Sequence, residues 1–184
     1  MTRAAHRVLT IDVLVASDRW KDAQKPQSIV RRAVRRAASA LSTRGTEIGI
    51  VLTDDSAIRA LNRDWRGIDA ATNVLSFPTE NAAAKHLGDI VLGFETIARE
   101  ARSQRKPFAH HLAHLAVHGF LHLAGYDHER PKEALEMERT EREILRQLAI
   151  PDPYRRRGPS GGSARRRPRH KRPARDKAKQ PQQS

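Results

Sequence analysis

His118–His128, with the sequence HGFLHLAGYDH, is the most informative stretch of this chain. His118 and His122 are four residues apart, so on a helix they lie one turn apart on the same face. Two imidazoles in that arrangement can share one metal ion. Gly125 comes three residues later, where a helix can end in a left-handed glycine cap and turn His128 back as a third ligand. Three neutral nitrogens would leave the fourth position of a zinc ion open to water, as in a catalytic site.

An isolated pair of histidines at helical spacing is more often an ordinary surface or core pair than a metal site. The third histidine after a glycine favours the metal site, and the chain has no cysteine that could complete a closed, structural one. The spacing is also similar to the H-E-x-x-H-x-x-G-x-x-H motif of metzincin proteases. Gly119 stands where those enzymes carry their general-base glutamate, so metal binding is expected here but the protease mechanism is not.

Length and composition indicate a single folded domain. The chain has 184 residues, enough for one domain with a substantial core, and the absence of cysteine excludes a disulfide framework. It has no run of about 18 apolar residues and no signal-peptide segment, so we expect a soluble, cytoplasmic protein without membrane contact.

Positive charge is concentrated at the C-terminus. Residues 155–184 hold twelve Lys or Arg and one acid, Asp176, which gives this tail +11 of the formal net charge of +14. The tail is rich in Pro, Gly, Ser and Gln and almost free of large apolar residues, so it cannot bury enough surface to fold. We therefore expect a folded domain over residues 1–154 and a disordered basic tail over residues 155–184.

Hydrophobic patterns predict an α+β domain with a small mixed four-stranded sheet and packed helices. The expected strands are 8–15, 47–53, 72–78 and 88–93. The expected helices are 27–42, a short one that carries Ile58, Leu61 and Trp65, 95–104, 107–124 and 132–149. The last helix should turn Met137, Ile144 and Leu148 to the core and its acids and arginines outward. Strands and helices that do not alternate strictly favour the α+β class.

Several motifs together resemble the YbeY family of bacterial endoribonucleases, the ribosomal RNA maturation factors. The family signature H-G-x-x-H-L-x-G-Y-D-H is present without a break from His118 to His128. The segments T-N-V-L-S-F-P at 72–78, L-G-D-I-V at 87–91 and the acidic E-M-E-x-x-E-x-x-I pattern at 136–144 follow the family in the same order.

The resemblance implies a zincin-like α+β fold with one zinc ion per chain, held by His118, His122 and His128. It also implies metal-dependent cleavage of single-stranded RNA, 3′-end maturation of 16S ribosomal RNA and ribosome quality control, with ribosomal RNA and the small subunit as partners. The functional arginine of the family's Y-R-G-K-D segment corresponds to Arg66, although this chain has Trp65 for Tyr and Ile68 for Lys. The basic tail extends beyond the family pattern, and we expect it to contact RNA phosphates.

The sequence leaves the details of catalysis open. Arg66 could hold the scissile phosphate through its planar guanidinium. Gly119 cannot act as a general base, which leaves zinc hydroxide, Asp127, His114 or the RNA 2′-hydroxyl, and Asp127 could instead orient a ligand imidazole. Two other functions compete with the ribonuclease: a non-catalytic, zinc-stabilised ribosome assembly factor, and a metallopeptidase, against which Gly119 argues.

Overall fold

The computed structural model describes residues 9–41, 43, 47–79, 85–128 and 130–154. The elements follow the chain in the order β1 (Thr10–Val15), a 3-10 helix (Asp18–Asp22), α1 (Pro26–Leu41), β2 (Glu47–Thr53), α2 (Asp55–Arg66), β3 (Val74–Pro78), β4 (His86–Gly93), α3 (Phe94–Ser103), α4 (Phe108–Leu123) and α5 (Pro131–Gln147). The expected basic tail lies outside the described residues, so its disorder and the domain boundary at residue 154 stay predictions.

The four strands form one mixed sheet, as the sequence predicts. Their order is β1-β2-β4-β3, with β1, β2 and β4 parallel and β3 antiparallel to β4. In the centre, Ile50 of β2 lies between Val13 of β1 and Ile90 of β4. β3 therefore lies at the edge of the sheet, with β4 as its one neighbouring strand.

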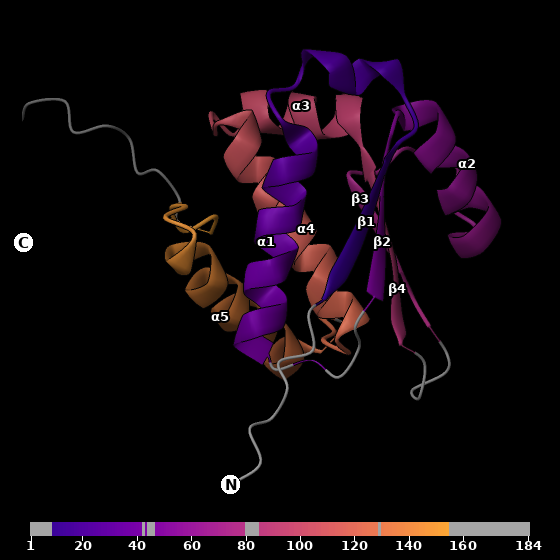
Figure 1. Ribbon diagram of the computed structural model, residues 1–184. Coiled ribbons are helices and arrows are strands. Elements are labelled where there is room, and N and C mark those ends of the chain that lie inside the picture. The colour runs from indigo at the N-terminus through magenta and orange to yellow at the C-terminus, as the bar shows by residue number, and fades with distance from the viewer. Residues whose placement is uncertain (1–8, 42, 44–46, 80–84, 129, 155–184) are drawn as a thin grey trace, which may run out of the picture. The chain divides into compact units, whose positions relative to one another are not determined.

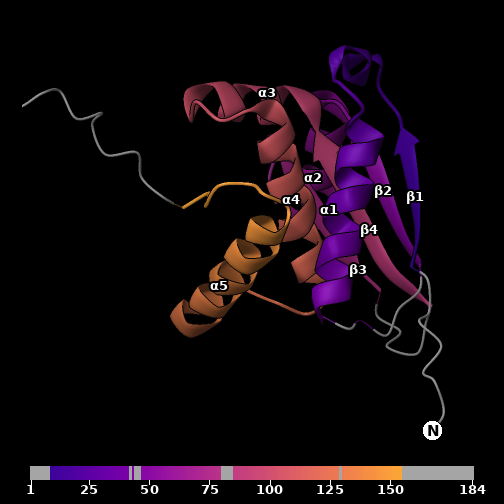
Figure 2. The same ribbon diagram turned by 60° about the vertical axis from the view of Figure 1, so that its left-hand side comes forward.

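Helices cover both faces of the sheet, but unequally. Figure 1 shows α2 on one side of the strands and α1, α4 and α5 on the other, and the turned view in Figure 2 agrees. Ile58 of α2 packs with Leu75 and Val91 in a small cluster, whereas the main core lies between the sheet and the larger helical layer. α4 runs through the middle of that layer, and ten of its residues are buried.

Most expected elements are present, with local differences. β4 begins at His86, two residues before the expected strand, because His86 pairs with Glu47 of β2. A 3-10 helix that the sequence pattern does not predict places Trp20 in the core, where its indole donates to the Thr53 carbonyl at 2.8 Å. No helix among the described residues is long and apolar enough to cross a bilayer.

One expectation about side chains is wrong, and the sequence does not predict the exposure of another side chain. The sequence predicts that all acids of α5 lie at the surface, yet Glu141 is fully buried because it accepts hydrogen bonds from two histidines of α4. Trp65, which α2 carries as expected, is 72% exposed, because α2 reaches the sheet mainly through Ile58. Both residues bear on function.

Candidate metal centre

The end of α4 is built by a glycine motif that the sequence predicts. After Leu123 the helix stops, and Gly125 adopts a left-handed conformation with φ of 88°. The Gly125 amide donates to the His122 carbonyl at 3.1 Å, and the Tyr126 amide donates to the Leu121 carbonyl at 3.0 Å. This is the hydrogen-bond pattern of a Schellman motif, and it reverses the chain toward the helix.

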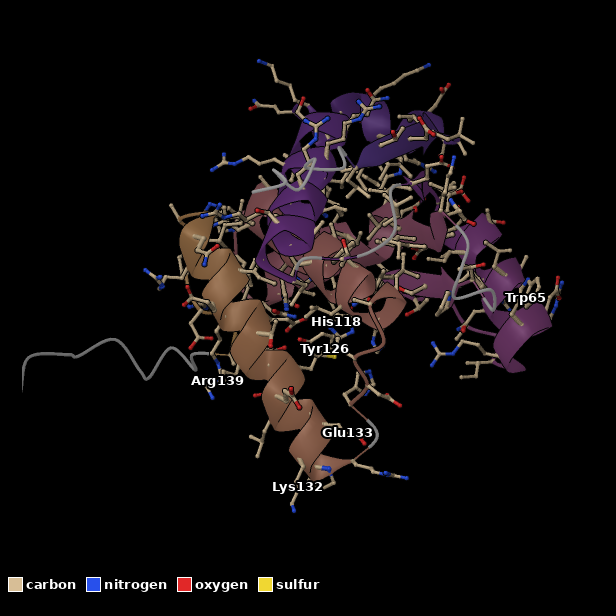
Figure 3. All side chains as sticks on the ribbon, turned by 60° about the horizontal axis from the view of Figure 1, so that its bottom comes forward. Trp65, His118, Tyr126, Lys132, Glu133 and Arg139 are labelled. Carbon is tan, nitrogen blue, oxygen red and sulfur yellow. The ribbon has the colours of Figure 1, made fainter. Side chains whose placement is uncertain are left out.

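The reversal brings the three histidines of the signature together. One ligand atom from each of His118, His122 and His128 lies within 4.8 Å of the other two, so this group could hold a metal ion. The Nε2 atoms of His118 and His122 are 3.1 Å apart. His118 and His122 are half-buried, whereas His128 is exposed on the loop after the cap. Figure 3 shows His118 beside Tyr126, at the point where α4 gives way to that loop.

Glu141 of α5 fixes the orientation of His118. Its Oε1 lies 2.7 Å from the Nδ1 of His118. A carboxylate can only accept, so Nδ1 carries the proton and Nε2 keeps a lone pair. That lone pair lies on the side of His122, where a metal would be held. A carboxylate that orients a ligand imidazole in this way also makes it a stronger ligand.

The environment of Glu141 keeps it charged despite its burial. Burial alone would raise the pKa of Glu141, but hydrogen bonds from His114 and His118 overcome this and lower the pKa to about 2. His114 Nε2 lies 3.3 Å from Oε2, and the hydroxyl of Tyr154 donates to the same oxygen. Burial raises the pKa of Tyr154, and Glu141 raises it further, so the phenol stays a donor. His114 therefore supports Glu141 and does not face the triad.

Burial and the neighbouring histidines hold His122 neutral, and the backbone of the loop after α4 orients its ring. Burial lowers the pKa of His122, and the nearby His118 and His128 lower it further, while a backbone hydrogen bond with Tyr126 has the opposite effect. A neutral imidazole is the form that binds a metal. Each of the two helical histidines thus has an oriented ring, one through Glu141 and one through the backbone of the reversed loop.

Gly119, between the two helical histidines, is required by packing. A Cβ at this position would lie 2.9 Å from Cγ2 of Ile90, 3.1 Å from Oγ of Ser76 and 3.2 Å from Cγ2 of Val74. The Ser76 hydroxyl also donates to the Gly119 carbonyl at 3.1 Å. α4 therefore lies directly on β3 and β4 at the level of the triad. A glutamate at this position would have no room, which excludes the metzincin arrangement for physical reasons.

Asp127 and Arg66 differ in how they relate to the triad. The Asp127 carboxylate accepts a hydrogen bond from the His128 amide at 2.6 Å, so it stabilises the loop that carries the third histidine. Arg66 is the last residue of α2, on the opposite face of the sheet, and is exposed. Within the described part of the chain, its guanidinium makes no ion pair or hydrogen bond.

A hollow of about 440 Å³ lies between the loop that follows α4 and the first turns of α5. Its lining includes Asp127, Glu133 and Glu136, and Arg130 is the one cation among the described residues that line it. Arg130 itself lies 3.5 Å from Glu133. The hollow is therefore acidic and disfavours an anionic ligand.

The donor set fits zinc. Two imidazole nitrogens on a tetrahedral zinc, with Zn–N distances near 2.05 Å, are separated by roughly 3.3 Å. The 3.1 Å between His118 and His122 is close to this value. Three imidazoles, no thiolate and a carboxylate behind one ring are typical of a catalytic zinc site.

The sequence motifs do not reveal Glu141 and Tyr154 as members of the site. A signal for Glu141 is present, since it follows Met137 by four residues and precedes Ile144 by three, on the buried stripe of α5. A charged residue on such a stripe indicates a buried partner. Tyr154 carries no comparable local signal, because its contact with Glu141 depends on how the segment after α5 folds back.

Comparisons with known proteins agree with this geometry. A family model described as endoribonuclease YbeY matches residues 15–149. The endoribonuclease YbeY of Bradyrhizobium sp. strain BTAi1 is 49% identical over 155 residues, which cover 79% of this chain and 92% of the relative. That of Rhodopseudomonas palustris strain BisB18 is 50% identical over 152 residues, covering 78% and 90%.

A solved structure supports the fold alone. The solution structure of a Thermotoga maritima protein matches with a TM-score of 0.53 and 24% identity, and the match covers 80% of this chain and all of the other. Together, the matched residues 15–149, the two relatives at about half identity and the clustered histidines show that the chain belongs to the endoribonuclease YbeY family.

Proposed function

We propose that this protein is a zinc-dependent endoribonuclease that cuts single-stranded RNA. The observation that carries the proposal is the triad of His118, His122 and His128, whose ligand atoms lie within 4.8 Å of one another. The two relatives described above, both named endoribonuclease YbeY, support the choice of RNA as the substrate. The absence of space for a general base at Gly119 argues against a metallopeptidase.

The three histidines would hold one zinc ion per chain, and Glu141 would keep His118 in the ligand tautomer. When bound, zinc supplies a Lewis acid that brings the pKa of water down to about 7 and polarises a phosphoryl oxygen. Asp127 would act by holding the His128 amide, and hence the third ligand, in place.

Arg66 is the proposed phosphate contact. Its guanidinium is exposed and has no partner among the described residues, so its full charge is available to a phosphodiester. A planar fork can bind two phosphate oxygens at once, which would hold the RNA backbone on the α2 side of the sheet. Arg66 lies on the side of the sheet away from the acidic hollow, where an anion can approach.

The proposed substrates in the cell are ribosomal RNA and the small ribosomal subunit. We infer roles in 3′-end maturation of 16S ribosomal RNA and in ribosome quality control, in the cytoplasm, from the family to which the chain belongs. The Lys/Arg-rich tail, residues 155–184, would bind RNA phosphates in a way that is independent of sequence.

Metal analysis combined with a cleavage assay tests the proposal. The purified full-length chain should contain one zinc per chain, and it should cut a labelled single-stranded RNA but leave duplex RNA and casein intact. His122→Ala should lose both the zinc and the cleavage, whereas His110→Ala, on the same helix but outside the triad, should lose neither. Zinc-loaded protein that degrades casein, or does not cut RNA, would refute the proposed activity.

Complementation in cells separates the enzyme from an assembly factor. In a strain that lacks its own copy of the gene, wild-type protein should restore the mature 16S 3′ end, whereas Arg66→Ala should leave precursor RNA. If Arg66→Ala and His122→Ala both restored maturation, the protein would act without cleavage, and the non-catalytic alternative would be preferred.

A further inference from the structure

Trp65 is the most exposed large apolar residue of the described chain. Its side chain is 72% exposed, and Ile68, three residues later, is 48% exposed. Figure 3 shows Trp65 on α2, at the end of the domain away from His118. A single exposed apolar residue is common on folded surfaces, so what Trp65 can bind depends on the groups around it.

The turn that presents Trp65 is rigidly held. Gly67 ends α2 with φ of 71°, and its amide donates to the Arg63 carbonyl at 3.0 Å. Arg59 and Asp69 form a two-pronged ion pair at 2.7 and 2.8 Å across the turn. The buried amide of Asn62 donates to the Ala70 carbonyl at 2.8 Å. Exposure of Trp65 therefore does not result from a loose loop.

The indole is supported from one direction and open in others. The Phe77 ring of β3 meets it edge-on, with centroids 5.6 Å apart and an interplanar angle of 66°. Arg66 follows directly in the sequence, and no acid among the described residues neutralises it. An exposed aromatic beside an unpaired arginine matches the two needs of single-stranded nucleic acid, which are base stacking and phosphate neutralisation.

β3 connects this surface to the metal centre. Successive side chains of a strand point to opposite faces. Ser76 donates to the carbonyl of Gly119, between the two helical histidines, while the next residue, Phe77, contacts Trp65. One edge strand thus separates the triad from Trp65, and the acidic hollow lies on the side of α5.

We propose that Trp65 is a stacking platform for an unpaired base of a single-stranded RNA that crosses the β3 edge to reach the triad. Arg66 then holds the phosphate next to the stacked base. The proposal rests on the proposed ribonuclease function and adds to it the path of the substrate. Stacking is tolerant of sequence, because every base has an aromatic face.

Tryptophan fluorescence tests stacking directly in the unmodified protein. The chain has two tryptophans, and Trp20 is only 2% exposed, so a response to ligand reports Trp65. In EDTA, with the fold verified by circular dichroism, oligouridylate should quench the emission with saturation. Inorganic polyphosphate, which has charge but no bases, should not quench the emission. RNA binding that is verified by anisotropy but leaves the emission unchanged would overturn the proposal.

Substitution gives a second, independent measurement. Loss of the stacking contact between an aromatic side chain and one base lowers RNA affinity by about 5-fold to 150-fold. Trp65→Ala should raise Kd and KM within this range and change kcat little, and Trp65→Phe should restore most of the affinity. Leu14→Ala, at the opposite edge of the sheet and 61% exposed, is the matched control and should bind RNA normally. Equal affinity for wild type and Trp65→Ala, or an equal loss in Leu14→Ala, would overturn the proposal.

The outcomes separate the two proposals. If the wild type cuts and binds RNA while Trp65 makes no difference, stacking alone fails. If the wild type neither cuts nor binds RNA, the ribonuclease function fails and stacking fails with it. If Trp65→Ala instead abolishes self-association seen by sedimentation, and RNA affinity is unchanged, the surface is an interface between copies of the chain and the stacking proposal is overturned.

Discussion

Replacing Glu141 with glutamine should weaken metal binding while preserving the fold. The glutamine has nearly the same shape, and its carbonyl oxygen can still accept a hydrogen bond from His118 Nδ1, where the carboxylate now lies at 2.7 Å. The substitution removes the negative charge and puts an NH2 donor in place of the oxygen that now accepts from His114 and Tyr154, so those two groups must turn or change tautomer to accept from it. A hydrogen bond to a charged group contributes about 1.5–3 kcal/mol, against about 0.5–1.5 kcal/mol for a neutral one.

The difference, about 1–1.5 kcal/mol, corresponds to a roughly 5- to 13-fold decrease in affinity from this one bond. Removing a partner that orients a metal ligand typically costs about 10- to 100-fold, so we expect the zinc Kd of Glu141→Gln to rise by about 10-fold or somewhat more. Competition between the protein and a chromophoric chelator at about pH 7.5, where the imidazoles are largely neutral, measures this Kd directly.

Glu100→Gln is the matched control. Glu100 lies 2.8 Å from Nε2 of His111, which is also on α4, so the substitution removes an equivalent carboxylate–imidazole pair away from the triad. Its zinc Kd should equal that of the wild type. The reasoning is refuted if Glu141→Gln binds zinc as tightly as the wild type, or if Glu100→Gln is weakened as much as Glu141→Gln.

Four further predictions concern the rest of the molecule. Arg66→Ala should reduce RNA cleavage with metal content and melting temperature unchanged, and Arg66→Lys should recover only part of the activity because a point charge lacks the guanidinium fork; wild-type cleavage by Arg66→Ala would contradict this. Removal of residues 155–184 should flatten the dependence of log affinity for RNA on log salt by about 0.7 for each phosphate that the tail neutralises; equal slopes would mean that the tail does not bind RNA. Burial lowers the pKa of His111, so the folded state resists protonation of this side chain. In metal-free protein, the free energy of unfolding should therefore fall as pH drops below about 6.5, the pKa of histidine in the unfolded chain, and it should fall less in His111→Gln. Chemical denaturation at several pH values measures both. Gly119→Ala should lower the free energy of unfolding by up to about 2 kcal/mol, because overpacking by about 1–3 kcal/mol exceeds the gain in helix propensity of about 1 kcal/mol; an unchanged or raised melting temperature would contradict the close packing on β3.

The parts of this structure that could be predicted from sequence are those whose cause is local. Gly125 ends α4 in a left-handed conformation because only glycine adopts it at little cost, and a spacing of four residues on a helix places His118 and His122 on one face whatever surrounds them. The positions of Glu141 and Trp65 could not be predicted in the same way. Both depend on which face of a helix meets another element, and that depends on contacts between residues far apart in the chain.

Gly119 shows how packing restricts the chemistry that a metal site can support. In a metzincin, the residue after the first histidine supplies the general base. Here the same position lies against Ile90, Ser76 and Val74 at distances that crowd even a Cβ and leave no room for a longer side chain. The carboxylate of Glu141 reaches His118 from behind the ring and accepts a hydrogen bond from its protonated nitrogen. A carboxylate in that position can orient a ligand but cannot take a proton from an attacking water on the open side. Proton transfer must therefore come from a group on the open side or from the RNA itself, and an RNA substrate, unlike a peptide, carries a 2′-hydroxyl beside the scissile phosphate.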